Sequence, residues 1–301
     1  MTSRLIFATR PSALARWQTR FVIQELQSKW SDYSFDELLI TTKGDRELEV
    51  ALPEIGGKGL FTAELEEALR DRQVHAAVHS LKDLPIDETP GLIIGAILPR
   101  ADARDVLVCP SGFTLDELPA ESIVGTSSNR RQAQLLAYRP DFRIQAIRGN
   151  IDTRLRKVQA GQYDAIVLAA AGIIRLNLQE QITQYLPPEV MLPAPGQGAL
   201  AVQCREDDEE TLRLLSAIEH TATRKMVIAE RAFLSGLGGG CSLPVGALAE
   251  IQGEDISLQG VVASPDGEQI LKLVGTGNDP YQVGKDLALK ALTLGADRLI
   301  H

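Results

Sequence analysis

Apolar residues in the first third of the chain follow two spacings, which predict strands alternating with helices. Short apolar runs predict strands at 4–9, 35–41 and 76–79. Amphipathic spacing predicts a helix that Ser12 caps and a second helix over 61–70. The apolar face of the first helix would carry Leu14, Trp17, Phe21 and Leu26. This part of the chain therefore has the pattern of an α/β domain.

The same alternation starts again in the middle of the chain. Apolar runs predict strands at 123–125, 142–147 and 164–169. Helices are predicted from 126 to about 137 and over 151–159, and a further strand at 199–204. Such alternation indicates a parallel sheet with helices on both faces, here formed twice.

The last part of the chain follows a different pattern. A long polar helical region over 209–234 leads into a run of glycines. Strands are then predicted at 246–251, 256–263 and 269–275, separated by turn residues, with one amphipathic helix at about 281–294. This pattern indicates a small α+β domain.

Composition places the chain among ordinary globular proteins. Hydrophobic residues make up 44% and charged residues 24% of its 301 residues, a length that allows two or three domains. The N-terminal residues contain neither an export signal nor a transit peptide, and the most apolar stretch, 165–174, is too short for a bilayer. We therefore expect a cytoplasmic protein with no membrane partner. Three cysteines without a CxxC pair predict free thiols and no metal site.

Charge is distributed unevenly along the chain. A net charge of −9 argues against nucleic acid as a partner. Between Thr126 and Lys157, however, seven arginines and one lysine face only Asp141 and Asp152, a local balance of +6. A solvated helix face would explain such a run. Arginine forks also suit carboxylates and phosphates, so the run equally fits a small, multiply anionic ligand.

Two arginine-bearing turns lie where a predicted strand leads into a helix. The first contains Thr126, Ser128, Arg130 and Arg131, and the second contains Arg148 and Arg154. Backbone N–H groups, the helix dipole and the guanidiniums would converge on an anion there. If the two strands are neighbours, both turns lie at the same sheet edge. Ordinary helix capping and two unrelated surface turns remain the alternatives.

A carboxylate beside a lysine follows the predicted strand at 76–79. Asp83 could transfer protons or stabilise a cation, although adjacent Asp and Lys in a loop are more often plain turn residues. Pro85 blocks a helix, which predicts a loop at the end of the strand. His79 ends the apolar run and is expected to be a hydrogen-bonded core histidine.

Two glycine-rich segments have candidate roles. The segment 55–61 lacks the Ser or Thr of a phosphate loop after Lys58, so it suits a mobile lid or a plain surface loop. The glycines at 236 and 238–240 leave accessible backbone before Cys241. Cys204, by contrast, lies within an apolar strand. Cys241 is therefore a candidate for covalent attachment, provided that its exposure and pKa allow thiolate chemistry.

In this order, the segments resemble the porphobilinogen deaminase (hydroxymethylbilane synthase) family over essentially the whole chain. The matching motifs are ATR at 8–10, GGKGLF at 56–61, HSLKDLP at 79–85, VGTSS at 124–128, RRQ at 130–132, RGN at 148–150, PGQGA at 195–199 and GGC at 239–241. Each motif alone is unspecific, whereas the ordered set is highly specific.

The resemblance implies an α/β fold of two periplasmic-binding-protein-like (type II) domains that flank a cleft, with a small C-terminal α+β domain. Domain 1 would comprise 1–98 plus 197–216 and contain the aspartate loop. Domain 2 would comprise 99–196 and contain the arginines, and domain 3 would comprise 217–301 and contain the cofactor cysteine. We expect a monomer.

The resemblance also implies the chemistry. Such enzymes add four porphobilinogen molecules to a dipyrromethane cofactor, losing ammonia each time, and release linear hydroxymethylbilane by hydrolysis. The product would pass to uroporphyrinogen-III synthase, in the biosynthesis of haem and chlorophyll. The cofactor would be joined to Cys241 by a thioether bond, and Asp83 would be catalytic. Cofactor contacts are implied at Lys82, Asp83, Thr126, Ser128, Arg130, Arg131 and Arg148. Substrate contacts are implied at Arg10, Ser80, Arg148, Arg154 and Arg175, and a lid residue at Lys58.

Departures from the family pattern are confined to two places. Thr42-Lys43-Gly44-Asp45 stands where Thr-Arg-Gly-Asp is usual, and Pro11 stands where a polar residue is usual. We expect neither to touch a residue assigned to chemistry. A non-enzymatic anion receptor would explain the arginine turns but not Cys241 or the third domain. A phosphoryl-transfer enzyme is weakened by the missing phosphate loop.

Overall fold

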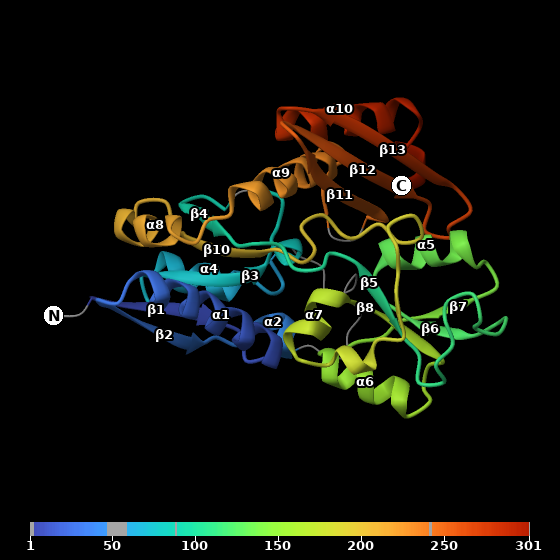
Figure 1. Cartoon of the computed structure of the whole chain (residues 1–301), viewed down its shortest axis with the longest axis horizontal. Coiled ribbons are helices and arrows are strands. Elements are labelled where there is room, and N and C mark those ends of the chain that lie inside the picture. The colour runs from blue at the N-terminus through green and yellow to red at the C-terminus, as the bar shows by residue number, and fades with distance from the viewer. Residues whose placement is uncertain (1–2, 47–58, 88, 241–242, 301) are drawn as a thin grey trace. The chain divides into compact units, whose positions relative to one another are not determined.

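The computed structural model describes residues 3–46, 59–87, 89–240 and 243–300. These residues form two five-stranded sheets and one three-stranded sheet (Figure 1). The chain divides into two compact units: unit 1 is Met1–Ala101 with Ala199–Arg224, and unit 2 is Asp102–Gly198 with Lys225–His301.

Unit 1 is built on a five-stranded sheet in the order β2-β1-β3-β10-β4. Its strands are β1 (Ser3–Thr9), β2 (Tyr33–Leu39), β3 (Ala76–Ser80), β4 (Leu92–Ile97) and β10 (Leu200–Arg205). Its helices are α1 (Ala13–Lys29), α2 (Lys43–Arg46), α4 (Ala63–Arg70) and α8 (Glu209–Ser216). Strands β1, β2 and β3 are parallel, whereas β10 runs antiparallel to both of its neighbours.

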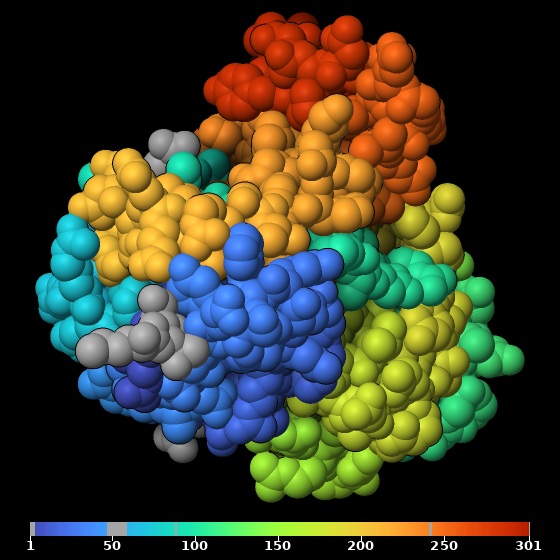
Figure 2. Space-filling view, turned by 60° about the vertical axis from the view of Figure 1, so that its left-hand side comes forward, coloured from blue at the N-terminus to red at the C-terminus, as the bar shows by residue number. Residues whose placement is uncertain are grey.

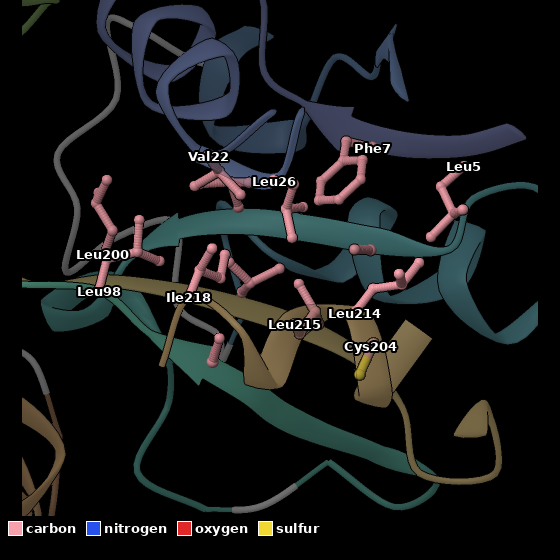
Figure 3. Close-up of a cluster of buried hydrophobic side chains, with 14 residues drawn as sticks. Leu5, Phe7, Val22, Leu26, Leu98, Leu200, Cys204, Leu214, Leu215 and Ile218 are labelled. Carbon is pink, nitrogen blue, oxygen red and sulfur yellow. The ribbon is translucent and has the colours of Figure 1, made fainter. Parts of the chain in front are cut away.

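Two apolar clusters form the core of unit 1. One is shown in Figure 3 and includes Phe7 of β1, Val22 and Leu26 of α1, and Leu214 and Leu215 of α8. The other includes Leu65 and Leu69 of α4 together with Ala77 of β3. Each large side chain buried in this way contributes roughly 1.5–3 kcal/mol to folding. Both helical layers are therefore held to the sheet, which fixes the C-terminal ends of β1 and β3.

The buried face of α1 differs from the predicted one. Ser12 caps the helix as expected. The buried positions, however, are Gln18, Thr19, Val22 and Leu26, while Leu14, Trp17 and Phe21 are half-buried. Gln18 is accommodated because its Nε2 donates a hydrogen bond of 2.9 Å to Ser80 Oγ. Gln18, a polar residue with a hydrogen-bond partner inside the protein, thus lies on the buried face of α1, where hydrophobic spacing alone predicts an apolar residue.

The five-stranded sheet of unit 2 has the order β7-β6-β8-β5-β9. Its strands are β5 (Asp105–Val108), β6 (Ile123–Gly125), β7 (Arg143–Gln145), β8 (Ala165–Ala169) and β9 (Gln184–Tyr185). Its helices are α5 (Asn129–Tyr138), α6 (Ile151–Gln159) and α7 (Ala170–Arg175). Strands β6, β7 and β8 are parallel, and β5 is antiparallel to β8 and β9.

The C-terminal part of unit 2 is an antiparallel sheet covered by helices. It consists of β11 (Val245–Gln252), β12 (Asp255–Ala263) and β13 (Ile270–Gly277), with α9 (Thr221–Gly236), α10 (Pro280–Thr293) and α11 (Asp297–Ile300). Gly284 of α10 packs on α9 so closely that a Cβ atom there would lie 2.3 Å from the Ala229 carbonyl oxygen. Helix α10 lies at the surface, where the red part of the chain is visible in Figure 2. None of the described helices is both long and apolar enough to cross a bilayer.

The α/β class and the small C-terminal α+β part are confirmed, but the predicted parallel direction of the strands is wrong and some elements were missed. The two large sheets are mixed rather than parallel, because β10 and β5 run against their neighbours. Strands β4, β5 and β9 were not predicted. The predicted helical region over 209–234 consists of two helices, α8 and α9. Hydrophobic periodicity identifies a strand but not its direction beside a partner from a distant part of the chain. The three-domain division and the cleft remain predictions.

Candidate active site

The predicted site residues fall on both units. Those in unit 1 are Arg10, Ser80, Lys82 and Asp83, and those in unit 2 are Thr126, Ser128, Arg130, Arg131, Arg148, Arg154 and Arg175. Nearly all of them follow the C-terminal end of a strand, where ligands bind in open α/β sheets. Lys58 and Cys241 lie outside the described residues.

The turn after β3 presents an exposed carboxylate on a fixed backbone. Residues Leu81–Asp83 form one turn of 3-10 helix rather than the irregular loop that was expected, and Leu84 is extended before Pro85. The Leu81 N–H donates to the Ala199 carbonyl at 3.0 Å. Asp83 is exposed and Lys82 is half-buried. The backbone of this turn is thus held in place while the Asp83 side chain faces solvent.

His79, at the end of β3, is buried as expected. Only 6% of the residue is exposed, and its Nε2 has no hydrogen-bond partner among the described residues. Burial lowers the pKa of His79 to about 4; the nearby Gln203 side chain opposes this shift, and the Arg10 charge adds a smaller lowering. The imidazole is therefore neutral at physiological pH.

Arg10 follows β1 and is paired within unit 1. Its Nη2 and Nε donate to both carboxylate oxygens of Asp45 over 2.5–3.2 Å, and its guanidinium lies 4.2 Å from the centroid of the Phe61 ring. Thr42 Oγ1 donates to the same carboxylate at 2.8 Å. Burial alone would raise the pKa of Asp45, but Arg10 and Thr42 outweigh it and lower that pKa. The loop at 42–45 thus contacts a predicted site residue through Asp45, which matches the family pattern, whereas the departure in this loop is at Lys43.

The turn after β6 is organised by two hydroxyls. Thr126 is buried, and its Oγ1 accepts a hydrogen bond of 3.2 Å from the Ser128 N–H. Ser128 caps α5, where its Oγ accepts from the Arg131 N–H at 3.4 Å. The hydroxyls thus fix the first turn of α5 and with it the starting points of the Arg130 and Arg131 side chains.

Arg130 and Arg131 converge on an internal carboxylate. Both arginines are buried, and each lies 2.7 Å from an oxygen of the fully buried Asp105. Gln197 Nε2 donates to the same carboxylate at 2.9 Å. Burial would raise the pKa of Asp105, but the two guanidiniums outweigh it and hold the pKa well below its ordinary value. Two guanidiniums and one carboxylate leave this buried group with a formal net charge of +1.

The turn after β7 presents Arg148 with part of its guanidinium buried. No described residue forms a hydrogen bond with its buried Nη1. The Gly149 carbonyl accepts from Arg154 Nε at 2.7 Å. Gly149 has a φ of +112°, and a Cβ atom there would lie 2.7 Å from the Thr153 side chain, so only glycine fits this turn. Strands β6 and β7 are neighbours in the sheet, so the two arginine-bearing turns lie at one sheet edge and the alternative of two unrelated turns is excluded.

Arg175 is the last residue of α7. It is buried, and its Nη2 donates to the Gly198 carbonyl at 2.8 Å. Burial lowers its pKa to about 10, so the guanidinium remains charged at neutral pH. Unit 2 therefore holds several buried or half-buried cations that follow β6, β7 and β8.

Comparison with known proteins identifies the family. The model described as "Porphobilinogen deaminase, dipyromethane cofactor binding domain" matches residues 5–213, and the model of the C-terminal domain of the same enzyme matches 224–293. The chain belongs to the porphobilinogen deaminase family. The expected family, transferase activity and dipyrromethane cofactor are thereby confirmed, with porphobilinogen as the substrate.

Relatives within the porphobilinogen deaminase family match almost the whole chain. The porphobilinogen deaminase of Brevibacillus brevis is 52% identical over 96% of this chain and 94% of its own length. That of Bacillus subtilis is 48% identical over 97% of this chain and 94% of its own length. The two-part family match and these relatives span both compact units.

Solved structures of other proteins are similar at a much lower level. The methionine-binding protein MetQ has a TM-score of 0.45 and 11% identity, covering 74% of this chain and 92% of its own. The periplasmic VFT2 domain of BvgS from Bordetella pertussis has a TM-score of 0.42 and 15% identity, covering 71% and 86%. Neither likeness bears on the chemistry of this porphobilinogen deaminase.

The described residues fit a dipyrromethane, whose pyrrole rings carry acetate and propionate groups. The buried Nη1 of Arg148 lacks a partner among them, and the group around Asp105 has a net charge of +1. A buried polar atom without a partner is costly, so a bound carboxylate would stabilise both places. No cluster of His, Cys, Asp or Glu suited to a metal ion is present in the described ranges.

Sequence reasoning missed three residues that hold predicted site residues in place within their own units. Asp45 pairs with Arg10, and Asp105 pairs with Arg130 and Arg131. Gln197 lies in the PGQGA motif, but no role was assigned to it. An acidic residue at the start of an apolar strand, as in Asp105-Val-Leu-Val, is a usable signal because such a carboxylate needs a buried partner.

Proposed function

We propose that Asp83 is the catalytic carboxylate of this porphobilinogen deaminase and that the arginine-bearing turns bind the carboxylates of cofactor and substrate. The buried Nη1 of Arg148, which no described residue engages, carries the proposal. Thr126, Ser128, Arg130 and Arg131 bind the cofactor together with Lys82, while Arg10, Ser80, Arg154 and Arg175 bind the substrate. Arg148 serves both.

The exposed Asp83 carboxylate suits a role in the loss of ammonia. When ammonia leaves porphobilinogen, positive charge develops on the pyrrole, and a fixed carboxylate stabilises that charge. In its protonated form, Asp83 would first transfer its proton to the departing amine, which leaves the carboxylate that stabilises the charge. The bond between the Leu81 N–H and the Ala199 carbonyl supports this role, because it prevents the turn from shifting as charge develops.

The arginines hold the anionic groups while the chain grows. Each added pyrrole brings one acetate and one propionate, so the negative charge increases by two per step. Planar guanidiniums pair with carboxylates through two parallel hydrogen bonds, which orients as well as binds. When bound, the dipyrromethane supplies the pyrrole carbon to which the first porphobilinogen is joined.

Cys241 is proposed as the attachment point, through a thioether bond. The other two cysteines, Cys109 and Cys204, are buried free thiols. Burial raises the pKa of Cys204 to about 12, so its thiolate is scarce at neutral pH. The glycine-flanked Cys241 is the remaining thiol.

The setting of the enzyme rests on the family alone. We propose a cytoplasmic monomer that passes hydroxymethylbilane to uroporphyrinogen-III synthase, on the route to haem and chlorophyll. Lys58 is proposed as a lid residue.

Arg148, which follows β7, and Arg143, the first residue of β7, provide the test of the binding proposal. We expect Arg148→Leu to lose cofactor loading or elongation, because it leaves a cofactor or substrate carboxylate unpaired. The loss of such a pair weakens binding by about 2–5 kcal/mol. Arg143→Leu is the matched control, since Arg143 is 69% exposed and pairs with the exposed Glu121. The measurements are intact mass, which reports the attached dipyrromethane, and ammonia release. An Arg148→Leu enzyme that is loaded and active like the Arg143→Leu enzyme would refute the proposal.

A further inference from the structure

The hydroxyl of Ser127 links the two arginine-bearing turns. Ser127 Oγ donates a hydrogen bond of 2.8 Å to the Ile147 carbonyl and accepts one of 3.1 Å from the Ile147 N–H. Ile147 directly precedes Arg148, and Ser127 lies between the proposed ligand residues Thr126 and Ser128. One side chain therefore joins the backbone of the β7 turn to the β6 turn, within unit 2.

The link extends the pairing of two strands beyond the point where their backbones separate. Strands β6 and β7 are paired as far as Gly125 and Gln145, and the Thr126 N–H still donates to the Gln145 carbonyl at 3.0 Å. After that the chain turns into α5 on one side and toward α6 on the other. A hydroxyl both donates and accepts, so Ser127 supplies the two hydrogen bonds that the backbone no longer provides.

The backbone around Arg148 is held from a second side by α6. Lys157 Nζ donates to the Arg148 carbonyl at 3.2 Å, and Arg154 Nε donates to the Gly149 carbonyl at 2.7 Å. Ile147 is itself 1% exposed in an apolar cluster. The start of the Arg148 side chain is thus fixed by its backbone neighbours, although its Nη1 has no partner among the described residues.

We infer that Ser127 is a positioning residue, which clamps Ile147 so that Arg148 and the Thr126–Arg131 turn bind one anionic group in a fixed geometry. The inference rests on the proposed function of Arg148. Ser127 differs from Thr126 and Ser128 because its hydroxyl donates its proton to the Ile147 carbonyl. Ser127 therefore acts by positioning Arg148 and does not itself bind the ligand. Misplacing a binding group by about 1 Å can cost up to a hundredfold in rate.

Three variants separate the clamp from a general loss of stability. Ser127→Ala removes both hydrogen bonds, whereas Ser127→Thr keeps the hydroxyl. Ser122→Ala is the matched control, because the hydroxyl of this buried serine, just before β6, also donates to a backbone carbonyl, that of Pro119, at 2.7 Å. We expect kcat/KM for porphobilinogen to fall about tenfold to a hundredfold in Ser127→Ala. Ser127→Thr should recover most of the loss, and Ser122→Ala should stay near the parent.

Two further measurements do not depend on overall activity alone. Amide hydrogen exchange at Ile147, resolved by mass spectrometry, should be faster in Ser127→Ala than in the parent and in Ser127→Thr. The second measurement is a double-mutant cycle on kcat/KM. Ser127→Ala should lower kcat/KM much less in an Arg148→Lys background than in the parent, because the effects of coupled residues are not additive. An equal loss of kcat/KM in both backgrounds would overturn the inference, and so would an unchanged rate of amide hydrogen exchange at Ile147.

The outcomes also distinguish this inference from the proposed function. A normal Arg148→Leu enzyme refutes the binding role of Arg148. A normal Ser127→Ala enzyme beside an impaired Arg148→Leu enzyme overturns only the clamp.

Discussion

In the turn after β3, Asp83 is exposed on a short 3-10 turn whose backbone is fixed. In the turn after β6, Arg130 and Arg131 are buried and share one carboxylate, that of Asp105. The proposed catalytic charge is therefore in contact with solvent, whereas the proposed binding charges of Arg130 and Arg131 are part of the interior of unit 2.

The difference follows from the cost of burying charge. Two buried guanidiniums without a partner would strongly destabilise unit 2, and Asp105 offsets one of the two charges. A single exposed carboxylate needs no such partner, because water solvates it. We therefore expect changes at the arginine group to affect stability and binding together, and changes at Asp83 to affect rate alone.

The largest expected effect is a loss of stability in Asp105→Asn. This change leaves Arg130 and Arg131 buried without their carboxylate, which should lower the free energy of unfolding by about 3–5 kcal/mol. Asp36→Asn is the control, because its exposed pair with Arg4 should be worth less than about 1 kcal/mol. Denaturant unfolding of both variants measures the difference. Equal midpoints would show that the buried group does not hold unit 2 together.

The second effect concerns rate at Asp83. Asp83→Asn keeps the shape of the side chain but removes its charge, so turnover should fall by about 10²–10³. Asp83→Glu keeps the charge but displaces it, and should retain more activity than Asn. Stability and cofactor mass should change little in either variant, since the side chain is exposed. If Asn turns over like the parent, or Glu is no better than Asn, Asp83 is only a turn residue.

The smallest effect is a pH dependence at His79, the buried residue beside the exposed turn. Its pKa is about 4 when folded and 6.5 ordinarily, so between these values the unfolded chain binds a proton that the folded chain does not. Stability should therefore decrease as the pH falls from 6.5 to 4, by up to about 3 kcal/mol from this residue. His79→Gln should flatten the curve of unfolding free energy against pH over that window. An unchanged slope would contradict the burial argument.

The sequence by itself determined most of the order of elements, the cap at Ser12, and the strand ends at which site residues stand. These features depend on local spacing and on turn chemistry, which residues close in the chain specify. It left open whether β6 and β7 lie side by side, although consecutive strand–helix units tend to pair. The ordered motifs, finally, pointed to the family.

Only the tertiary structure decided which charges are paired and which strands are antiparallel to their neighbours. Asp105 lies 25 residues before Arg130 in sequence, and Gln197 lies 92 residues after Asp105, yet all three meet in one buried group. Strand β10 enters between β3 and β4 after more than 100 intervening residues. No local pattern records such contacts, because a buried charge is stabilised by whichever partner the folded chain brings to it. Burial, rather than spacing, therefore separates the arginines that are held inside from the aspartate that is left exposed.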